Sequence, residues 1–222
     1  EKKAVSENYS RLAAVLGGNK DDMYLAYQTH TTSVRSVSLE DRGKGVVRER
    51  DYRDVDGLVT DVPKIVLVTF FADCVPLYFL DPVHRAIGLS HSGWRGTSLG
   101  IAPKAVAKMT ALYGTRPADV LAAIGPGTGP CCFATHADVP TALADRLGPA
   151  VRPFCQPLER AAGKFTVDLK GIIAWELRQA GLAEEHIDTL PLCTACHLEL
   201  YWSHRKMGDQ RGNHAAMIAL EG

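Results

Sequence analysis

Short apolar runs separated by turns dominate the hydrophobic pattern of this chain. Three successive runs, at residues 65–71, 75–80 and 86–90, are almost continuous in branched and aromatic residues. That pattern is typical of strands buried on both faces of a sheet. Weaker strand patterns follow the same logic and are predicted at residues 23–28, 120–124, 164–168, 187–190 and 214–220. The longest apolar run, residues 65–72, is too short to cross a bilayer.

Helical periodicity fills the gaps between several of these strands. Helices are predicted at residues 4–16, from Thr97 or Ser98 to about Tyr113, and at residues 138–147 and 169–180. Strands and helices do not alternate strictly, which disfavours a parallel doubly wound sheet. We therefore predict an α/β (α+β) sandwich of mixed sheets with helices outside, built as a single domain over residues 1–222. The charged stretch 40–54 is predicted to be an exposed excursion.

The composition of the chain argues against several classes of function. The 25 basic and 25 acidic residues cancel, and no segment forms a basic stripe, so binding of nucleic acid by bulk electrostatics is not expected. We expect no signal peptide at the start of this sequence. Six irregularly spaced cysteines in a chain this long suit a reducing compartment. We expect a cytoplasmic protein with no nucleic-acid partner and no membrane partner.

Candidate chemistry gathers at the ends of three predicted strands. His30, Cys74 and His91 each follow an apolar run, and their gaps of 44 and 17 residues exclude a local zinc-finger loop. Cysteine and histidine are strong ligands for zinc and copper, and three protein ligands leave a tetrahedral zinc one open position, the catalytic pattern. Two alternatives remain open. Cys74 and His91 could form a thiol hydrolase dyad, or all three residues could be packed core side chains.

Other motifs have two interpretations each. Trp94-Arg95, flanked by glycines, suits stacking and anion binding, or simple cation–π packing. His204-Arg205 could complete the anion site or lie on the surface. Cys193-x-x-Cys196 is typical of a redox pair or half a metal knuckle, but Cys131-Cys132 lies far upstream, so no partner pair is expected. We therefore expect these cysteines to be reduced and unnecessary for metal binding.

These motifs, in this order, resemble the YfiH/laccase-domain family over nearly the whole chain. The resemblance is carried by Gln28-x-His30, Ala72-Asp73-Cys74-Val75-Pro76, His91-Ser92-Gly93-Trp94-Arg95-Gly96-Thr97, Gly125-Pro126 through Cys131-Cys132, Cys193-Thr194 and Ser203-His204-Arg205. It implies a layered α/β/β/α fold and a zinc site at His30, Cys74 and His91. It also implies that the family's usual N-terminal strands are missing from this chain.

The resemblance implies several activities. Members have been described as multicopper polyphenol oxidases, and as purine nucleoside enzymes that phosphorolyse adenosine, inosine, guanosine and methylthioadenosine and deaminate adenosine. A bacterial branch has been linked to correction of peptidoglycan precursors. This chain departs from the family pattern at Thr31, Phe133-Ala134, Lys206 and Asn213, where Gly, Tyr-Glu, Arg and Arg are usual.

Among the activities that the resemblance implies, we expect those of a zinc-dependent purine nucleoside phosphorylase and adenosine deaminase. Polyphenol oxidation fits less well, because multicopper oxidation needs several copper centres rich in histidine and the chain has eight scattered histidines. The expected ligands are His30, Cys74 and His91. The last two, together with Asp73, are expected to be catalytic. Arg95, Trp94, Arg205 and His204 are expected to bind substrate and phosphate. The alternatives are an amidase acting on peptidoglycan precursors, a copper-dependent polyphenol oxidase, and a partner domain that metal merely stabilises.

Overall fold

A mixed six-stranded sheet forms the centre of the computed structural model, which describes residues 2–159 and 161–221. Its strand order is β11-β7-β5-β6-β3-β2. The inner pairs are antiparallel, whereas the two edge strands, β2 and β11, pair in parallel with their neighbours. The strands are β2 (Val34–Ser36), β3 (Gly57–Thr60), β5 (Val75–Asp81), β6 (Ala86–Ser92), β7 (Leu121–Ile124) and β11 (Ile187–Thr189).

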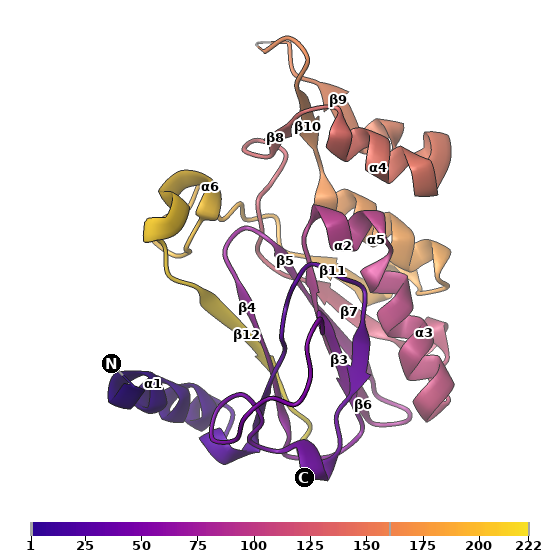
Figure 1. Ribbon diagram of the computed structural model, residues 1–222. Coiled ribbons are helices and arrows are strands. Elements are labelled where there is room, and N and C mark those ends of the chain that lie inside the picture. Colours follow the sequence, from indigo (N-terminus) through magenta and orange to yellow (C-terminus); the bar gives the residue numbers. More distant parts are fainter. Residues whose placement is uncertain (1, 160, 222) are drawn as a thin grey trace.

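A second sheet of order β1-β4-β12 packs against one face of the first (Figure 1). It consists of β1 (Met23–Leu25), β4 (Val66–Phe71) and β12 (His214–Ile218). One hydrophobic cluster joins the two sheets, with Leu67 and Phe71 from β4 against Leu58 and Leu89 from the central sheet. The apolar strands of each sheet are buried on both faces, because the other sheet covers the inner face and helices cover the outer face.

Helices cover the two outer faces, which completes an α/β/β/α sandwich and confirms the predicted fold class. Helix α1 (Lys2–Val15) packs Ala13 against Val66 and Val68 of the smaller sheet. Helices α3 (Ile101–Tyr113) and α5 (Leu169–Gln179) cover the central sheet on its other side. None of the described helices is both long and apolar enough to cross a membrane.

A small third sheet lies at one end of the sandwich, at the top of Figure 1. It comprises β8 (Ala134–Thr135), β9 (Cys155–Pro157) and β10 (Phe165–Val167), and it packs with α4 (Asp138–Leu147) around Leu143 and Val167. The two remaining α-helices are α2 (Trp94–Ser98) and α6 (His204–Met207), and 3₁₀ turns lie at Lys20–Asp22, Leu39–Asp41, Pro117–Asp119, Gly148–Phe154, Glu184–His186 and Gly208–Gln210.

Two local predictions were wrong. The helix expected from Thr97 or Ser98 is divided by Gly100, whose φ of 78° lies in the left-handed region and ends the short α2 before α3 begins. The excursion at residues 40–54 is only partly exposed. The ammonium group of Lys44 is buried, at 2.8 Å from both Asp41 and Asp51, so pairing of opposite charges draws this charged stretch inward.

Candidate active site

The three predicted metal ligands meet at one point of the fold. His91 lies in β6 directly opposite Pro76 of β5, Cys74 lies in the turn between β4 and β5, and His30 lies in the loop after β1. Their ligand atoms all lie within 4.8 Å of one another. The Cys74 Sγ is 3.7 Å from the His30 Nε2, and the two imidazole rings meet edge to face with centroids 4.9 Å apart. This arrangement is suited to holding a metal ion between two imidazoles and one thiolate.

Asp56, fully buried just before β3, orients this centre. Its Oδ1 accepts a hydrogen bond from His91 Nδ1 at 2.8 Å and another from the His30 backbone N–H at 3.0 Å. Its Oδ2 accepts from the backbone N–H groups of Thr29 and Thr31. Because Nδ1 of His91 donates to Asp56, the lone pair of Nε2 is left for the metal position. Sequence analysis missed Asp56, whose only sequence signal is an acidic residue at the start of a buried strand.

The electrostatics of the cluster favour an ionised thiol. Burial alone would raise the pKa of Cys74, but the neighbouring His30 and His91 rings outweigh it and lower that pKa to about 6. Burial would lower the pKa of His91, yet Asp56 and Cys74 raise it to about 9. A thiolate is the form that binds metal or attacks carbon, so the site prepares Cys74 for either role.

A glycine permits the close approach of these groups. A Cβ at Gly93 would lie 2.9 Å from Cys74 Sγ and 2.9 Å from His30 Cδ2, closer than real Cβ atoms come. Gly93 also precedes α2, which carries Trp94 and Arg95 over the site. Only a residue without a side chain leaves room there for the thiol, the imidazole and a metal ion.

A cavity of about 740 Å³ opens beside the ligands, within the range of pockets that hold small molecules. Seven of the eight predicted site residues line it, and the exception is His91, which is buried and lines an adjoining pocket shared with His30 and Cys74. The seven are His30, Asp73, Cys74, Trp94, Arg95, His204 and Arg205. Sequence reasoning missed Arg211, which also lines the cavity and lies two residues before Asn213, where the family pattern has Arg.

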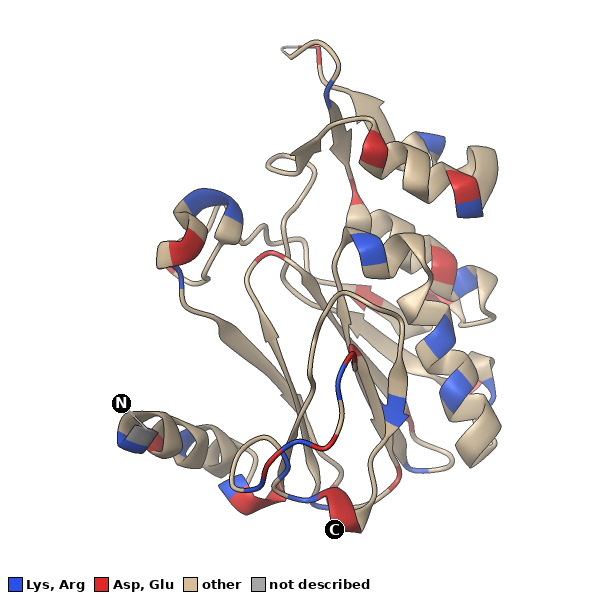
Figure 2. Ribbon diagram, in the orientation of Figure 1, with Lys and Arg blue, Asp and Glu red and all other residues tan. Residues whose placement is uncertain are grey.

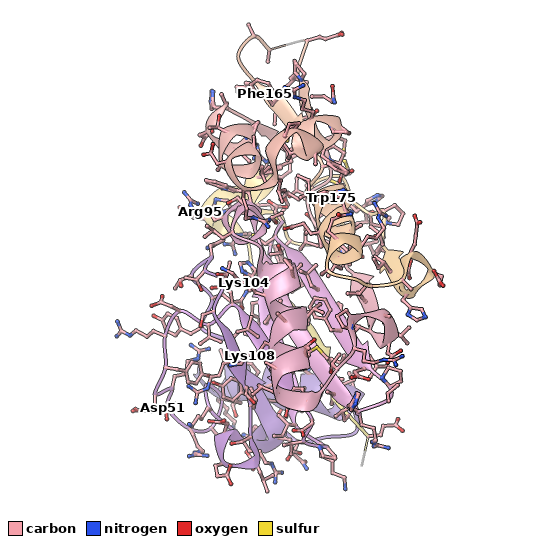
Figure 3. The ribbon with its side chains drawn as sticks, turned by 90° about the vertical axis from the view of Figure 1, so that its right-hand side faces the viewer. Asp51, Arg95, Lys104, Lys108, Phe165 and Trp175 are labelled. Atoms are coloured by element: carbon pink, nitrogen blue, oxygen red, sulfur yellow. The ribbon has the colours of Figure 1, made fainter. Side chains whose placement is uncertain are left out.

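Both predicted arginines rest on aromatic rings. The Arg95 guanidinium carbon lies 4.3 Å from the Trp94 ring centroid, so the cation–π packing foreseen as an alternative is present, and Arg95 also remains exposed to the cavity. Figure 3 shows Arg95 at the upper end of the α3 face, beyond Lys104. Arg205 lies over Phe133 at 5.2 Å and donates to the Ala134 carbonyl at 3.0 Å.

Basic side chains outnumber acidic ones around the cavity. Three arginines from different segments line it. Arg95 comes from α2, and Arg205 comes from α6, on which Figure 2 shows basic residues. Arg211 directly follows the 3₁₀ turn after α6. Asp73 is the only acidic residue among the cavity's lining residues in the described chain. Three guanidinium groups around one carboxylate make the cavity suited to an anion.

Asp73 itself is held in a network of hydrogen bonds. It has a φ of 87°, and its carboxylate accepts from the Thr194 hydroxyl at 2.7 Å and from the Arg205 backbone N–H at 2.6 Å. Burial would raise its pKa, but these hydrogen bonds outweigh burial and hold the pKa below its ordinary value. The carboxylate therefore stays ionised near neutral pH and ties the α6 segment to the Cys74 turn.

The expectation that Cys193 and Cys196 have no partner pair was wrong. The fold brings Cys131 and Cys132 to them, and the four Sγ atoms lie within 4.8 Å of one another. All six cysteines, each within the described part of the chain, are free thiols. The sequence separation of more than sixty residues concealed this second cluster.

Comparison with known proteins agrees with the fold and the motifs. The family described as "Multi-copper polyphenol oxidoreductase laccase" matches residues 1–221. Purine nucleoside phosphorylase YlmD of Geobacillus stearothermophilus is 37% identical over 229 residues, which cover 98% of this chain and 78% of that protein. Purine nucleoside phosphorylase LACC1 of Mus musculus is 31% identical, and the match covers 99% of this chain and 48% of that protein. The crystal structure of a Bacillus licheniformis hypothetical protein, YfiH, superposes with a TM-score of 0.94 at 33% identity, over 100% of this chain and 82% of that chain.

Proposed function

The chain belongs to the multi-copper polyphenol oxidoreductase laccase family, and from that premise we propose that it is a zinc-dependent purine nucleoside enzyme. It would phosphorolyse adenosine, inosine, guanosine and methylthioadenosine, and deaminate adenosine. The two relatives described above, 37% and 31% identical to this chain, are both named purine nucleoside phosphorylase, which supports the substrate class. The observation that carries the proposal is a two-imidazole, one-thiolate cluster at the wall of a cavity lined by three arginines.

The residues present fit a zinc ion. His30, Cys74 and His91 would hold it, because their donor atoms converge, Asp56 fixes the His91 ring, and Gly93 leaves the space a Cβ would fill. Three protein ligands are the catalytic pattern for zinc. When bound, zinc supplies Lewis acidity and lowers the pKa of water to about 7.

Phosphorolysis requires a phosphate anion beside the ribose. A phosphate oxygen attacks C1′, the bond from C1′ to the purine nitrogen breaks, and the base leaves as ribose 1-phosphate forms. Arg95, Arg205 and Arg211 all line the cavity and would hold the phosphate, since guanidinium groups bind phosphate oxygens in pairs. Trp94 and Phe133 would offer flat apolar surfaces to the purine.

Deamination uses the same cavity differently. Water adds at C6 of adenosine, ammonia leaves, and inosine remains. The step needs a proton to reach the departing nitrogen. Beyond the proposed metal ligands, exposed His204 and Asp73 both line the cavity. Because hydrogen bonds hold Asp73 ionised, its part would be to position the Arg205 backbone and orient a proton donor rather than to carry the proton.

Polyphenol oxidation, which the family's name suggests, is the weaker candidate. Multicopper oxidation uses several copper centres rich in histidine. Among the described residues 2–159 and 161–221, one potential metal cluster contains histidine, and the other consists of cysteine alone. The donor sets therefore favour zinc chemistry at a single catalytic centre.

A nucleoside panel with and without phosphate tests the proposal, with products separated by chromatography. Purine base and ribose 1-phosphate should appear only with phosphate, and inosine should form from adenosine without it. Cys74→Ala should abolish both reactions and lower the metal content by one equivalent. Cys155→Ala, which removes a partly buried thiol outside either cluster, is the matched control and should keep both. Absence of nucleoside turnover by metal-loaded wild type would overturn the proposal and favour the peptidoglycan-precursor amidase.

A further inference from the structure

Four cysteines from two distant loops form a second cluster outside the cavity. Cys131 and Cys132 lie in the turn that follows β7 and precedes β8, and Cys193 and Cys196 lie in the turn after β11. The Cys196 Sγ is 3.6 Å from that of Cys131 and 3.4 Å from that of Cys132. The catalytic proposal uses none of these side chains.

The sulfur positions match a tetrahedral site better than a disulfide. With zinc–sulfur bonds of about 2.3 Å, the edges of a four-sulfur tetrahedron measure about 3.8 Å. All four Sγ atoms lie within 4.8 Å of one another, and the two shortest separations are 3.4 and 3.6 Å. A disulfide requires sulfur atoms about 2.05 Å apart, so neither of these separations is that of a bonded pair.

A backbone hydrogen bond and a glycine hold the two cysteine turns together. The Gly129 backbone N–H donates to Cys193 Sγ at 3.2 Å, the kind of hydrogen bond that orients metal ligands. A Cβ at Gly129 would lie 3.3 Å from Cys193 Cβ and 3.4 Å from Cys131 Sγ, so glycine allows the loop to approach this closely.

A buried cation lies beside the cluster. The Lys170 side chain is 5% exposed, and its ammonium group donates to the carbonyls of Leu190 and Leu192, at 2.9 and 3.0 Å, at the start of the Cys193 turn. Four thiolates and one divalent cation carry a net charge of minus two, which a buried ammonium group partly offsets.

The cluster joins loops that position the active site. Cys193 pairs with Gly127 in a β-bridge, and the Thr194 N–H donates to the Gly127 carbonyl at 3.2 Å. The Thr194 hydroxyl reaches the carboxylate of Asp73, the residue before Cys74. A metal ion between the two turns would therefore restrict the motion of Thr194, which hydrogen-bonds to Asp73.

We propose that Cys131, Cys132, Cys193 and Cys196 bind one structural zinc ion as a closed four-thiolate site. Four protein ligands leave no open position, so this ion takes no part in substrate chemistry. It joins the turn after β7 to the turn after β11, and so stabilises the segment around Thr194 that hydrogen-bonds to Asp73. This proposal reverses the sequence-based expectation for Cys193 and Cys196, and it does not depend on the proposed function.

Metal analysis of protein purified with zinc under reducing conditions tests the site. Wild type should hold two zinc equivalents per chain, Cys74→Ala one, and Cys131→Ser/Cys196→Ser one. The triple variant should hold none. Cys131 and Cys196 are exposed, so their replacement by serine disturbs packing least, and Cys155→Ser is the matched control that should keep two. One equivalent in wild type that disappears in Cys74→Ala would overturn the proposal, as would iron in place of zinc.

X-ray absorption of zinc-loaded Cys74→Ala provides a measurement that does not require the serine variants to fold. Its remaining zinc should show four sulfur neighbours at about 2.3 Å. Nitrogen or oxygen neighbours in that shell would contradict the closed thiolate site. A mass of the freshly purified, unreduced chain showing a disulfide among these four cysteines would also contradict it and assign them to redox chemistry.

Discussion

One carboxylate oxygen of Asp56 contacts both histidines of the cluster formed by His30, Cys74 and His91. Its Oδ1 accepts from the ring of His91 at 2.8 Å and from the backbone N–H of His30 at 3.0 Å. His91 comes from a strand and His30 from a loop, so Asp56 couples the rigid and irregular parts of the site. The metal ligands thus depend on a residue that would not itself touch the metal.

Replacing this carboxylate should weaken metal binding. In Asp56→Asn, the side-chain amide nitrogen cannot accept the hydrogen bonds that one oxygen now receives, so His91 or His30 loses its orientation. Loss of such a supporting group typically lowers metal affinity 10–100-fold. Competition with a zinc-binding dye measures the effect at the catalytic site. Asp54→Asn is the matched control, since exposed Asp54 contacts Thr29 rather than a ligand side chain. Equal affinities in the two variants would show that Asp56 does not support the centre.

A single added methyl group should block the catalytic centre. Gly93 has a φ of −84°, which alanine adopts without strain, but its Cβ would lie 2.9 Å from Cys74 Sγ and from His30 Cδ2. We expect Gly93→Ala to lose about one zinc equivalent and retain the fold. Gly96→Ala is the control, because a Cβ there meets its nearest neighbours at ordinary contact distances of 3.5 Å or more. Metal analysis with circular dichroism checks both, and full metal content in Gly93→Ala would refute the steric argument.

Sequence analysis could single out His30, Cys74 and His91 because each lies at or just beyond the end of a predicted apolar run. Cys74 and His91 lie at facing ends of β5 and β6, so two adjacent runs were enough to bring them together. The second cluster could not be predicted in the same way. Its two pairs meet where Gly127 and Gly129 contact Cys193, a contact between irregular loops that leaves no periodic signal. Asp56 was missed for a similar reason, since one acidic residue near a charged stretch looks like a surface residue.

The short third sheet also escaped prediction in part. β10 was expected from its apolar pattern, but β8 and β9 have two and three residues and are half-exposed, too short to show an alternation. Burial of Lys44 was missed because a sequence gives no indication that Asp41 and Asp51 will converge on one ammonium group. The long buried strands could therefore be predicted from the local sequence pattern, whereas polar contacts between loops depend on the tertiary structure.

In protein stripped of metal by a chelator, Cys74 should titrate as an acidic thiol. The neighbouring His30 and His91 rings outweigh burial and lower its pKa to about 6, against an ordinary value of 9.0. Because the thiolate is the reactive form, alkylation by iodoacetamide should be half-maximal near pH 6 and level off above pH 7. Burial raises the pKa of Cys155, so the reactivity of Cys155 should still be rising at pH 9. Peptide-resolved mass spectrometry follows both residues in one sample, with circular dichroism as the check of folding. A Cys74 midpoint near 9 would contradict the histidine interaction.

Arg95 should separate the two proposed reactions. It is exposed at the cavity wall while packing on Trp94, and phosphorolysis needs a held phosphate that deamination does not. A charge-assisted hydrogen bond is worth roughly 1.5–3 kcal/mol, so Arg95→Ala should lower ribose 1-phosphate formation from inosine by about ten- to a hundredfold. Ammonia release from adenosine should change far less.

The control for this substitution is Lys108→Ala, which removes a basic side chain of α3 on the face that Figure 3 shows below Arg95, outside the cavity. It should leave both rates unchanged. If Arg95 served only to pack on Trp94, both activities of Arg95→Ala would fall together with its midpoint of thermal unfolding. Parallel losses in a destabilised variant would therefore refute the phosphate role. Selective loss of phosphorolysis at an unchanged midpoint would assign the guanidinium group to the phosphate.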